Sequence, residues 1–431
     1  MTFIHRSLVG SAVLAALVAT APPQPLGAQA QDALLARVRQ ERAAYLGTLR
    51  ELVAIESGSR DPEGLDRIAA LIADKLRALG GQVELVATGP DVYRMEDTPA
   101  QVGKSVVATF RGTGTKRVML LAHMDTVYQR GMAAKQPFRI EGDNAFGLGI
   151  ADDKSGVALA LHAVAVLQAL ARKDYSILTV LINGDEEISS PGSRNLITRL
   201  GGEHDAVFSC EGGGSDDSIE LTTSGNGAAL LRVTGRASHA GAAPLDGRNA
   251  LYELAHQMLQ TRDLSDPSIG LSLNWTIANA GGTRNIIPAA ASATGDARVT
   301  RVRDWDSLEA KLRERIARKL IPDTQVSLTI ERRRPPLEPT AASRALGAYA
   351  ASIYSVTGRR LGVTDVSGGG GTDAAFASLK TKAAVIEGLG PIGYGAHSDE
   401  REYIDLRSVE PRLYLLARLI VDVGSGKAPL N

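Results

Sequence analysis

The segment ILTVLINGDEE, residues 177–187, decides the fold of this 431-residue chain. Its first six residues form a nearly continuous apolar run without alternation, which is typical of a strand buried on both faces of a sheet. Asn183 and Gly184 follow the run, and three consecutive acids, residues 185–187, come next. A buried strand with polar residues at its carboxyl end predicts an α/β sheet with a functional site along that edge.

Strands and helices alternate on both sides of this segment. Further strands are expected at residues 83–87, 106–110, 118–122, 206–210 and 383–386. Helices are expected at residues 33–51, 65–79, 156–171, 193–200 and 409–423. This alternation predicts an α/β catalytic domain with helices on both faces of its sheet.

The pattern changes at about residue 223. Strands are expected at residues 228–233, 271–279, 289–299 and 324–331, and helices at residues 250–261 and 305–320. This βαββαβ order is that of a ferredoxin-like sandwich. After Pro335 and Pro336 the first pattern resumes, so we expect a catalytic domain of residues 31–222 and 337–431 that is interrupted by an α+β domain of residues 223–336.

The N-terminal residues have the features of an export signal. The apolar run Leu8–Val18 is shorter than the roughly 20 residues of a spanning helix, and Ala28 and Ala30 supply the small residues of a cleavage site. We therefore expect a signal peptide of residues 1–30 and a periplasmic or secreted mature protein. The 48 basic and 48 acidic residues give a formal net charge of zero, which argues against general affinity for nucleic acid or anionic membranes.

Two histidines and several carboxylates follow the predicted strands or open a predicted helix: His123, Asp125, Asp152, Asp153, Glu186, Glu187, Glu211 and His397. Each motif alone also fits a helix cap or a solvated loop. Together they bring imidazole and carboxylate to one edge, which suits zinc, with cobalt or manganese as alternatives. The surplus of acids fits two metals bridged by one carboxylate, with a spare carboxylate as general base.

Taken in order, these motifs resemble the di-zinc exopeptidases, which include carboxypeptidase G, peptidase T, the aminoacylases and carnosinase. The resemblance is greatest to the carboxypeptidase G branch and extends over nearly the whole mature chain. It rests on residues 123–125, 147–154, 185–187, 211 and 395–399, and on ASHAGAAP at 237–244, NWTIA at 274–278, NIIP at 285–288 and GGGTDAA at 369–375.

The resemblance implies a zinc-exopeptidase fold and a role for each site residue. One zinc ion would be held by His123 and Glu211, and the second by Glu187 and His397. Asp152 would bridge the two ions, and its peptide bond to Asp153 would be cis. Asp125 would orient His123, and Glu186 would be the general base.

The resemblance also assigns roles to the inserted domain, which would be a lid and a dimerisation surface. His239 would reach the partner subunit's site in a homodimer and stabilise the oxyanion there. Arg334 would bind the C-terminal carboxylate of the substrate, with Asn285 and the Gly371 backbone beside it. Arg298 would lie nearer the side chain of the released residue.

The function implied is a zinc carboxypeptidase that releases a C-terminal residue, expected to be glutamate, from N-acyl or short peptide substrates, with folate-like acyl groups among the candidates. An N-acyl-amino-acid amidohydrolase or a dipeptidase of the same family is the alternative. A catalytically inactive binding protein would have lost ligands, yet all five predicted ligands and Glu186 are present. A serine hydrolase is disfavoured because the sequence has no Gly-x-Ser-x-Gly motif.

Overall fold

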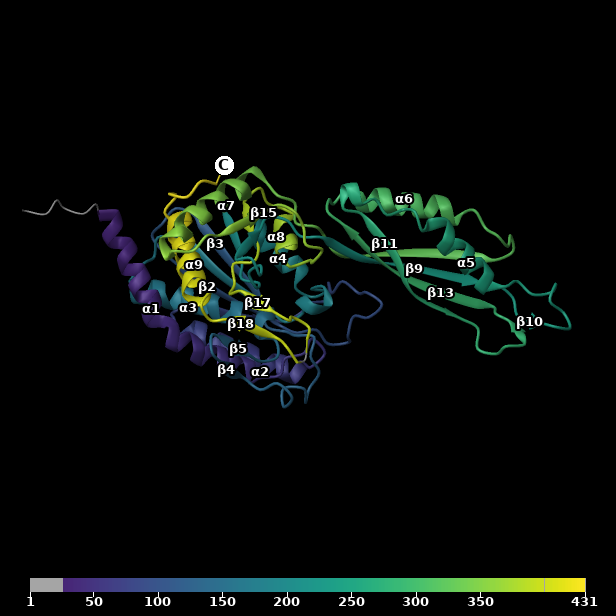
Figure 1. Ribbon diagram of the computed structural model, residues 1–431, viewed down its shortest axis with the longest axis horizontal. Coiled ribbons are helices and arrows are strands. Elements are labelled where there is room, and N and C mark those ends of the chain that lie inside the picture. Colours follow the sequence, from purple (N-terminus) through teal and green to yellow (C-terminus); the bar gives the residue numbers. More distant parts are fainter. Residues whose placement is uncertain (1–25, 399, 431) are drawn as a thin grey trace, which may run out of the picture.

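The computed structural model describes residues 26–398 and 400–430. The chain forms two bodies, a larger α/β domain and an elongated second domain that projects from it (Figure 1). The predicted signal peptide lies outside the described residues except for residues 26–30, which belong to the first helix, α1 (Leu26–Val53). Within the described part of the chain, no helix combines the length and the apolar character needed to cross a membrane.

The larger domain is built on a six-stranded sheet in the order β1-β2-β6-β3-β7-β16. Its strands are β1 (Gln82–Val86), β2 (Ser105–Arg111), β3 (Arg117–His123), β6 (Ile177–Asn183), β7 (Ala206–Ser209) and β16 (Ala384–Ile386). The last four strands of that order run parallel. Their carboxyl ends therefore meet at one edge, where His123 pairs in register with Asn183.

Helices cover both faces of this sheet, as predicted. One core contains side chains of five helices, α1, α2 (Pro62–Ala78), α3 (Ser155–Ala169), α7 (Ala341–Tyr354) and α9 (Val409–Gly424). The other face packs against α4 (Arg194–Gly202) and α8 (Ala374–Ser378). Leu120 of β3 belongs to the first core, and its neighbours Met119 and Leu121 belong to the second. β3 is thus buried on both faces, which explains its continuous apolar sequence.

Replacing Leu120 with alanine should lower the free energy of unfolding by about 2–5 kcal/mol, because the side chain is fully buried and the packed sheet cannot close the cavity. Leu85→Ala on the edge strand β1 is the matched control, since Leu85 is 40% exposed, and should cost less than about 1 kcal/mol. Denaturant unfolding measures both values. Equal costs at the two positions would contradict this assignment of the core.

Two small sheets are not predicted by the sequence. One is a four-stranded antiparallel sheet of β4 (Arg139–Glu141), β5 (Asn144–Phe146), β17 (Gly393–Tyr394) and β18 (Tyr403–Asp405). The other pairs β8 (Ser218–Glu220) with β15 (Gly362–Thr364) in parallel. The first one matters for function, because β17 and β18 flank the loop that carries His397.

The second domain has the predicted ferredoxin-like topology, and its main elements fall within residues 223–336. A four-stranded antiparallel sheet has the order β11-β13-β9-β14. Its elements are β9 (Gly225–Thr234), α5 (Ala250–Thr261), β11 (Ser272–Ala280), β13 (Ala290–Val299), α6 (Asp304–Ile316) and β14 (Gln325–Arg334). A short ladder of β10 (Ser238–His239) and β12 (Ile286–Ile287) lies at the end of this domain that is farthest from the six-stranded sheet (Figure 1).

Three predicted boundaries in this domain are wrong by three residues or more. Strand β9 begins at Gly225 and not at Ala228. Helix α6 ends at Ile316 and not at Leu320, because the Arg318 carbonyl accepts hydrogen bonds from α5 side chains, among them Gln260. Strand β14 continues beyond Glu331 to Arg334, with an irregularity in its pairing between Arg332 and Arg334. Such a bulge changes the direction in which successive side chains point.

Candidate metal centre

The predicted metal ligands come together at the carboxyl edge of the six-stranded sheet. His123 is the last residue of β3, and Glu211 follows β7 by two residues. Asp152 lies in the turn Ile150–Lys154 before α3, and Glu187 lies in the short helix Glu186–Ile188 after β6. His397 comes from the loop between β17 and β18, so five separate segments supply the site.

Together with Glu186, these residues form two groups of ligand atoms. Within each group, all the ligand atoms lie within 4.8 Å of one another. The first contains His123, Glu186 and Glu211, with His123 Nε2 3.3 Å from Glu211 Oε1. The second contains Asp152, Glu187 and His397, with His397 Nε2 3.1 Å from Glu187 Oε2. Nitrogen and oxygen ligands in this mixture fit zinc and related divalent ions.

Asp152 lies between the two groups and offers one carboxylate oxygen to each. Its Oδ1 is 2.9 Å from His123 Nε2, and its Oδ2 is 3.1 Å from His397 Nε2. This is the arrangement required of a carboxylate that bridges two metal ions. The peptide bond between Asp152 and Asp153 is cis, as the resemblance implies.

The electrostatics of this cluster favour a bound cation. Burial, reinforced by the neighbouring Asp152, raises the pKa of Glu187 to about 7. Burial also raises the pKa of Glu211, and it raises the pKa of Glu186 well above its usual range. Hydrogen bonds to Asp152 and Glu187 raise the pKa of His397 to about 10. Several acids therefore share a space in which their negative charges are unfavourable, and divalent ions would relieve this repulsion.

Asp125 supports both a histidine and the acidic loop. Its Oδ1 is 3.4 Å from His123 Nδ1, which favours the tautomer that leaves Nε2 free for a metal. The same carboxylate accepts the backbone N–H groups of Glu186 and Glu187 at 3.0 and 3.1 Å and the hydroxyl of Ser59 at 2.7 Å. Asp125 is fully buried and so fixes His123 relative to Glu186 and Glu187.

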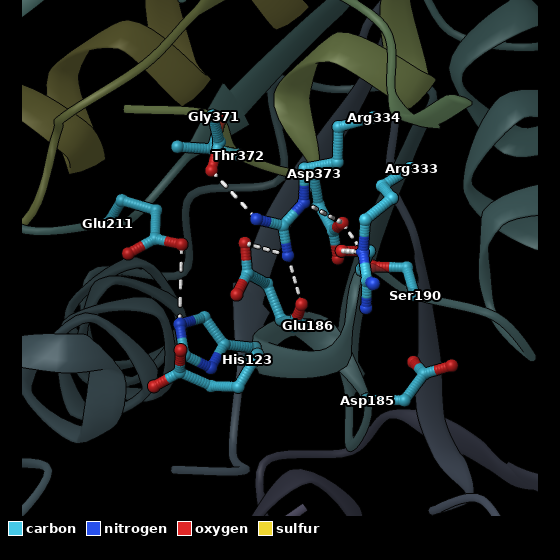
Figure 2. A network of polar contacts seen from close by, with 12 residues as sticks. His123, Asp185, Glu186, Ser190, Glu211, Arg333, Arg334, Gly371, Thr372 and Asp373 are labelled. Carbon is cyan, nitrogen blue, oxygen red and sulfur yellow. Dashed lines mark hydrogen bonds and ion pairs between the residues drawn. The ribbon is translucent and has the colours of Figure 1, made fainter. Parts of the chain in front are cut away.

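Arg334 lies against the predicted general base (Figure 2). Its Nη2 is 2.7 Å from Glu186 Oε1 and also donates to the Glu186 carbonyl, and its Nη1 donates to the Gly371 carbonyl at 2.9 Å. Both Arg334 and Glu186 are buried. The guanidinium therefore stabilises the charged form of Glu186 and opposes the effect of burial on its pKa.

The three consecutive arginines of β14 point to different partners because of the bulge. Arg332 pairs with Asp306 of α6 at 2.6 Å, on the outside of the second domain. Arg333 donates from Nη2 to both carboxylate oxygens of Asp97, each at 2.8 Å. Of the three, Arg334 alone contacts Glu186 beside the metal ligands.

A cavity of about 590 Å³ contains the metal centre and extends to the base of the second domain. Arg298 also lines this cavity; it pairs with Asp296, with Nε 3.0 Å from Oδ1, and its Nη1 donates to the Gly369 carbonyl at 3.1 Å. Arg298, Arg333 and Arg334 all line the cavity. Guanidinium groups can bind carboxylates through bidentate hydrogen bonds.

Two predicted site residues lie away from the metal centre. His239 is on β10, at the far end of the second domain (Figure 1). Asn285 is beside it, because its carbonyl accepts the N–H of Ala240 and the next two residues form β12. Within one chain the structure therefore does not bring Asn285 together with Arg334 and Gly371, or His239 together with the metal ligands.

Two buried carboxylates at the site are not identified by sequence reasoning. Glu402 accepts N–H groups of Gly149, Ala151 and Asp152 at 2.7, 2.8 and 3.2 Å, so it fixes the turn that carries the bridging aspartate. Asp373 lies 3.9 Å from Arg334 Nε and accepts a hydrogen bond from the Asn183 amide at 2.7 Å. Asp373 lies within the GGGTDAA motif, whereas no motif marks Glu402.

Comparisons with known proteins find relatives that match most of this chain. Residues 119–422 match the family described as Peptidase family M20/M25/M40. Carboxypeptidase G2 of Pseudomonas sp. (strain RS-16) is 40% identical over 98% of this chain and 99% of its own length. Succinyl-diaminopimelate desuccinylase of Gluconobacter oxydans is 29% identical over 82% of this chain and 96% of its own. The crystal structure of aminopeptidase PepT from Bacillus cereus has a TM-score of 0.72 and 19% identity, and the match covers 89% of this chain and 98% of that one.

Proposed function

The chain belongs to peptidase family M20/M25/M40 and is a metallo-hydrolase of the exopeptidase kind, and we propose that it is a two-zinc carboxypeptidase releasing C-terminal glutamate. The substrates would be N-acyl amino acids or short peptides. The similarity to carboxypeptidase G2 supports this reading over an N-acyl-amino-acid deacylase or a dipeptidase.

One observation carries the proposal: the cavity of about 590 Å³ is lined both by metal-ligating residues of the two groups, among them Asp152, Glu211 and His397, and by three arginines. A C-terminal glutamate has two carboxylates close to its scissile amide. Arg334, with Gly371 beside it, would bind the α-carboxylate, and Arg298 would bind the side-chain carboxylate. Bound in this way, the scissile amide would face the metal-ligating residues that line the same cavity.

Each residue of the site would have its own role in the reaction. His123 and Glu211 would hold one zinc ion, and Glu187 and His397 the other, with Asp152 shared. The ions supply Lewis acidity toward the water and the substrate carbonyl. Glu186 takes a proton from the attacking water and delivers it to the nitrogen of the departing amino acid. Asp125 and Glu402 hold the ligands in place.

The surface of the second domain supports assembly into a homodimer. β11 is an edge strand of its sheet, and Ile277 on this strand is 55% exposed. The adjoining helix α5 exposes Leu251 and Leu259, which line an apolar cavity of about 560 Å³. An exposed edge strand beside apolar side chains is a surface suited to a second copy of the same chain. In such a dimer His239 and Asn285 would reach the partner subunit's metal centre and complete it.

We further propose that the first thirty residues are an export signal and that the mature protein acts in the periplasm or outside the cell. The apolar run and the small residues before the expected cleavage site support this. N-terminal sequencing of protein recovered from the periplasm or the medium tests it. Full-length protein that stays in the cytoplasm would contradict it.

The proposed reaction is tested by measuring amino acids released from a panel of N-acylated amino acids by zinc-loaded mature protein. We expect chelator-sensitive cleavage that is fastest when the C-terminal residue is glutamate. Restoration of the rate by added zinc is the control for irreversible unfolding. Chelator-sensitive cleavage that prefers apolar residues would contradict glutamate specificity while leaving the metal centre intact.

Replacing Arg298 with methionine should raise KM for glutamate-releasing substrates about 10- to 100-fold. The reason is that a hydrogen bond between charged groups contributes roughly 1.5–3 kcal/mol. Substrates that release an apolar residue should be unaffected. Arg332→Met, which removes an arginine facing α6, is the matched control. An equal loss for both kinds of substrate would show that Arg298 is structural.

A further inference from the structure

Tyr128 lies just after β3 and is not part of the motifs that assign the site. Its side chain is buried, with only 8% of the residue exposed. Its hydroxyl lies 2.6 Å from Glu402 Oε2 and 3.1 Å from the Ser398 carbonyl oxygen. A phenolic hydroxyl has one proton to donate, so these two acceptors share a single donor. One buried side chain therefore contacts a segment that is some 270 residues away in the sequence at two points.

Both contacts lead to predicted ligands of the same ion. Glu402 holds the turn of the bridging Asp152 by accepting three of its N–H groups. Ser398 directly follows His397 in the chain. The side chains of Asp152 and His397 approach to 3.1 Å, between Oδ2 and Nε2. The Tyr128 hydroxyl thus joins the support of one ligand to the backbone beside the other.

His397 needs such a contact because its backbone is in an unfavourable conformation. Its φ angle is +64°, in the left-handed region that residues other than glycine rarely adopt. Its side chain is also 57% exposed, so packing does little to hold it. The turn around it is closed by a hydrogen bond of 2.9 Å from the Ser398 N–H to the Gly395 carbonyl. The contact between the Ser398 carbonyl and Tyr128 fixes this turn to the body of the domain.

The backbone that carries Tyr128 is itself held by the segment before α2. Thr126 pairs with Gly58 in a parallel bridge, its N–H donates to the Ser57 carbonyl at 3.0 Å, and its carbonyl accepts the Ser59 N–H at 3.0 Å. A Cβ atom at Gly58 would lie 2.2 Å from the Tyr128 carbonyl oxygen, so only glycine allows this close approach. The hydroxyl is therefore presented from a fixed part of the domain.

We propose that Tyr128 is a positioning residue for the ion held by Glu187, His397 and Asp152, and that its hydroxyl fixes His397 relative to Asp152. The inference rests on the proposed function in one respect, which is that these residues bind a metal ion. It does not depend on which amino acid the protein releases. Groups that orient metal ligands in this way contribute about 10- to 100-fold to metal affinity.

Tyr128→Phe tests the role, because it removes the hydroxyl and leaves the ring in place. Metal-free protein is titrated with Zn²⁺ in competition with a chromophoric chelator, and the wild type should bind two ions. The variant should bind one ion with nearly wild-type affinity and the other about 10- to 100-fold more weakly. Tyr349→Phe is the matched control, since it removes a hydroxyl that donates to the Asp422 carboxylate at 2.7 Å between α7 and α9. It should leave both affinities unchanged.

Two further backgrounds show which ion is affected. Glu211→Gln weakens the ion that His123 binds, so the remaining ion reports on the site of His397. Adding Tyr128→Phe to this background should lower the affinity for the remaining ion by about 10- to 100-fold. His397→Ala already removes the ligand that Tyr128 positions, so adding Tyr128→Phe to it should have no further effect.

The outcomes separate the role of Tyr128 from the reaction. Wild-type affinity for both ions in Tyr128→Phe would overturn the role, and so would an equal weakening by Tyr349→Phe, because a general loss of stability would then explain both. A further loss in the His397→Ala background would also overturn it. The expected binding pattern in a protein that releases no amino acid from N-acyl-glutamates would overturn the carboxypeptidase and leave the role of Tyr128 intact. A wild-type protein that binds no second ion would overturn both.

Discussion

Glu186→Gln should lower kcat by about 10²–10⁴-fold while the protein stays folded and retains both metal ions. The amide has nearly the shape of the carboxylate but cannot accept the proton of the attacking water. Arg334 keeps its hydrogen bonds to the carbonyls of Glu186 and Gly371, so the surroundings of the residue are preserved. Turnover measured beside metal content by atomic absorption tests both parts of the prediction.

The metal measurement matters because Glu186 lies within ligand distance of His123 and Glu211 in the structure. Glu211→Gln is the matched control, since it removes an acid of the same type from the same group and should lower the affinity for one ion. If Glu186→Gln also lost one equivalent of metal, Glu186 would be a ligand. Turnover close to that of the wild type would eliminate it as the base.

The sequence predicts most of the catalytic fold because its strands are buried on both faces. β3 and β6 therefore appear as continuous apolar segments, and their order with helices gives an α/β sheet whose carboxyl edge carries the site. The ferredoxin-like domain was predictable from its six elements in order. The strands of the small sheet β4–β5–β17–β18 are only two or three residues long and have no periodicity to detect.

The site residues were predictable to the extent that they lie in motifs. Glu402 acts through N–H groups some 250 residues earlier in the chain, for example that of Ala151. No local pattern encodes such a contact. The direction of each arginine in 332–334 depends on a bulge, which alternation along a strand does not predict. Motifs likewise carry no distances, so the separation of His239 from the metal ligands becomes evident only in three dimensions.

Because His239 lies far from the metal ligands of its own chain, its role in catalysis tests whether the active protein is a homodimer. His239→Ala should lower kcat by about 10²–10³-fold with little change in bound zinc, the loss expected when one donor to an oxyanion is removed. His256→Ala is the control, because His256 lies on α5 of the same domain and its Nε2 donates to the Arg318 carbonyl at 3.1 Å. It should leave kcat unchanged.

Mixing the two inactive variants distinguishes a role between subunits from a role within one. In a heterodimer of Glu186→Gln with His239→Ala, one site combines the intact Glu186 of one chain with the intact His239 of the other. Random exchange of subunits should therefore restore roughly one quarter of the wild-type activity, since half the dimers are mixed and each has one complete site. If heterodimers isolated through two different affinity tags remain inactive, His239 does not act in the partner subunit's site. His239 would then have to reach its own metal centre by a large movement of the second domain.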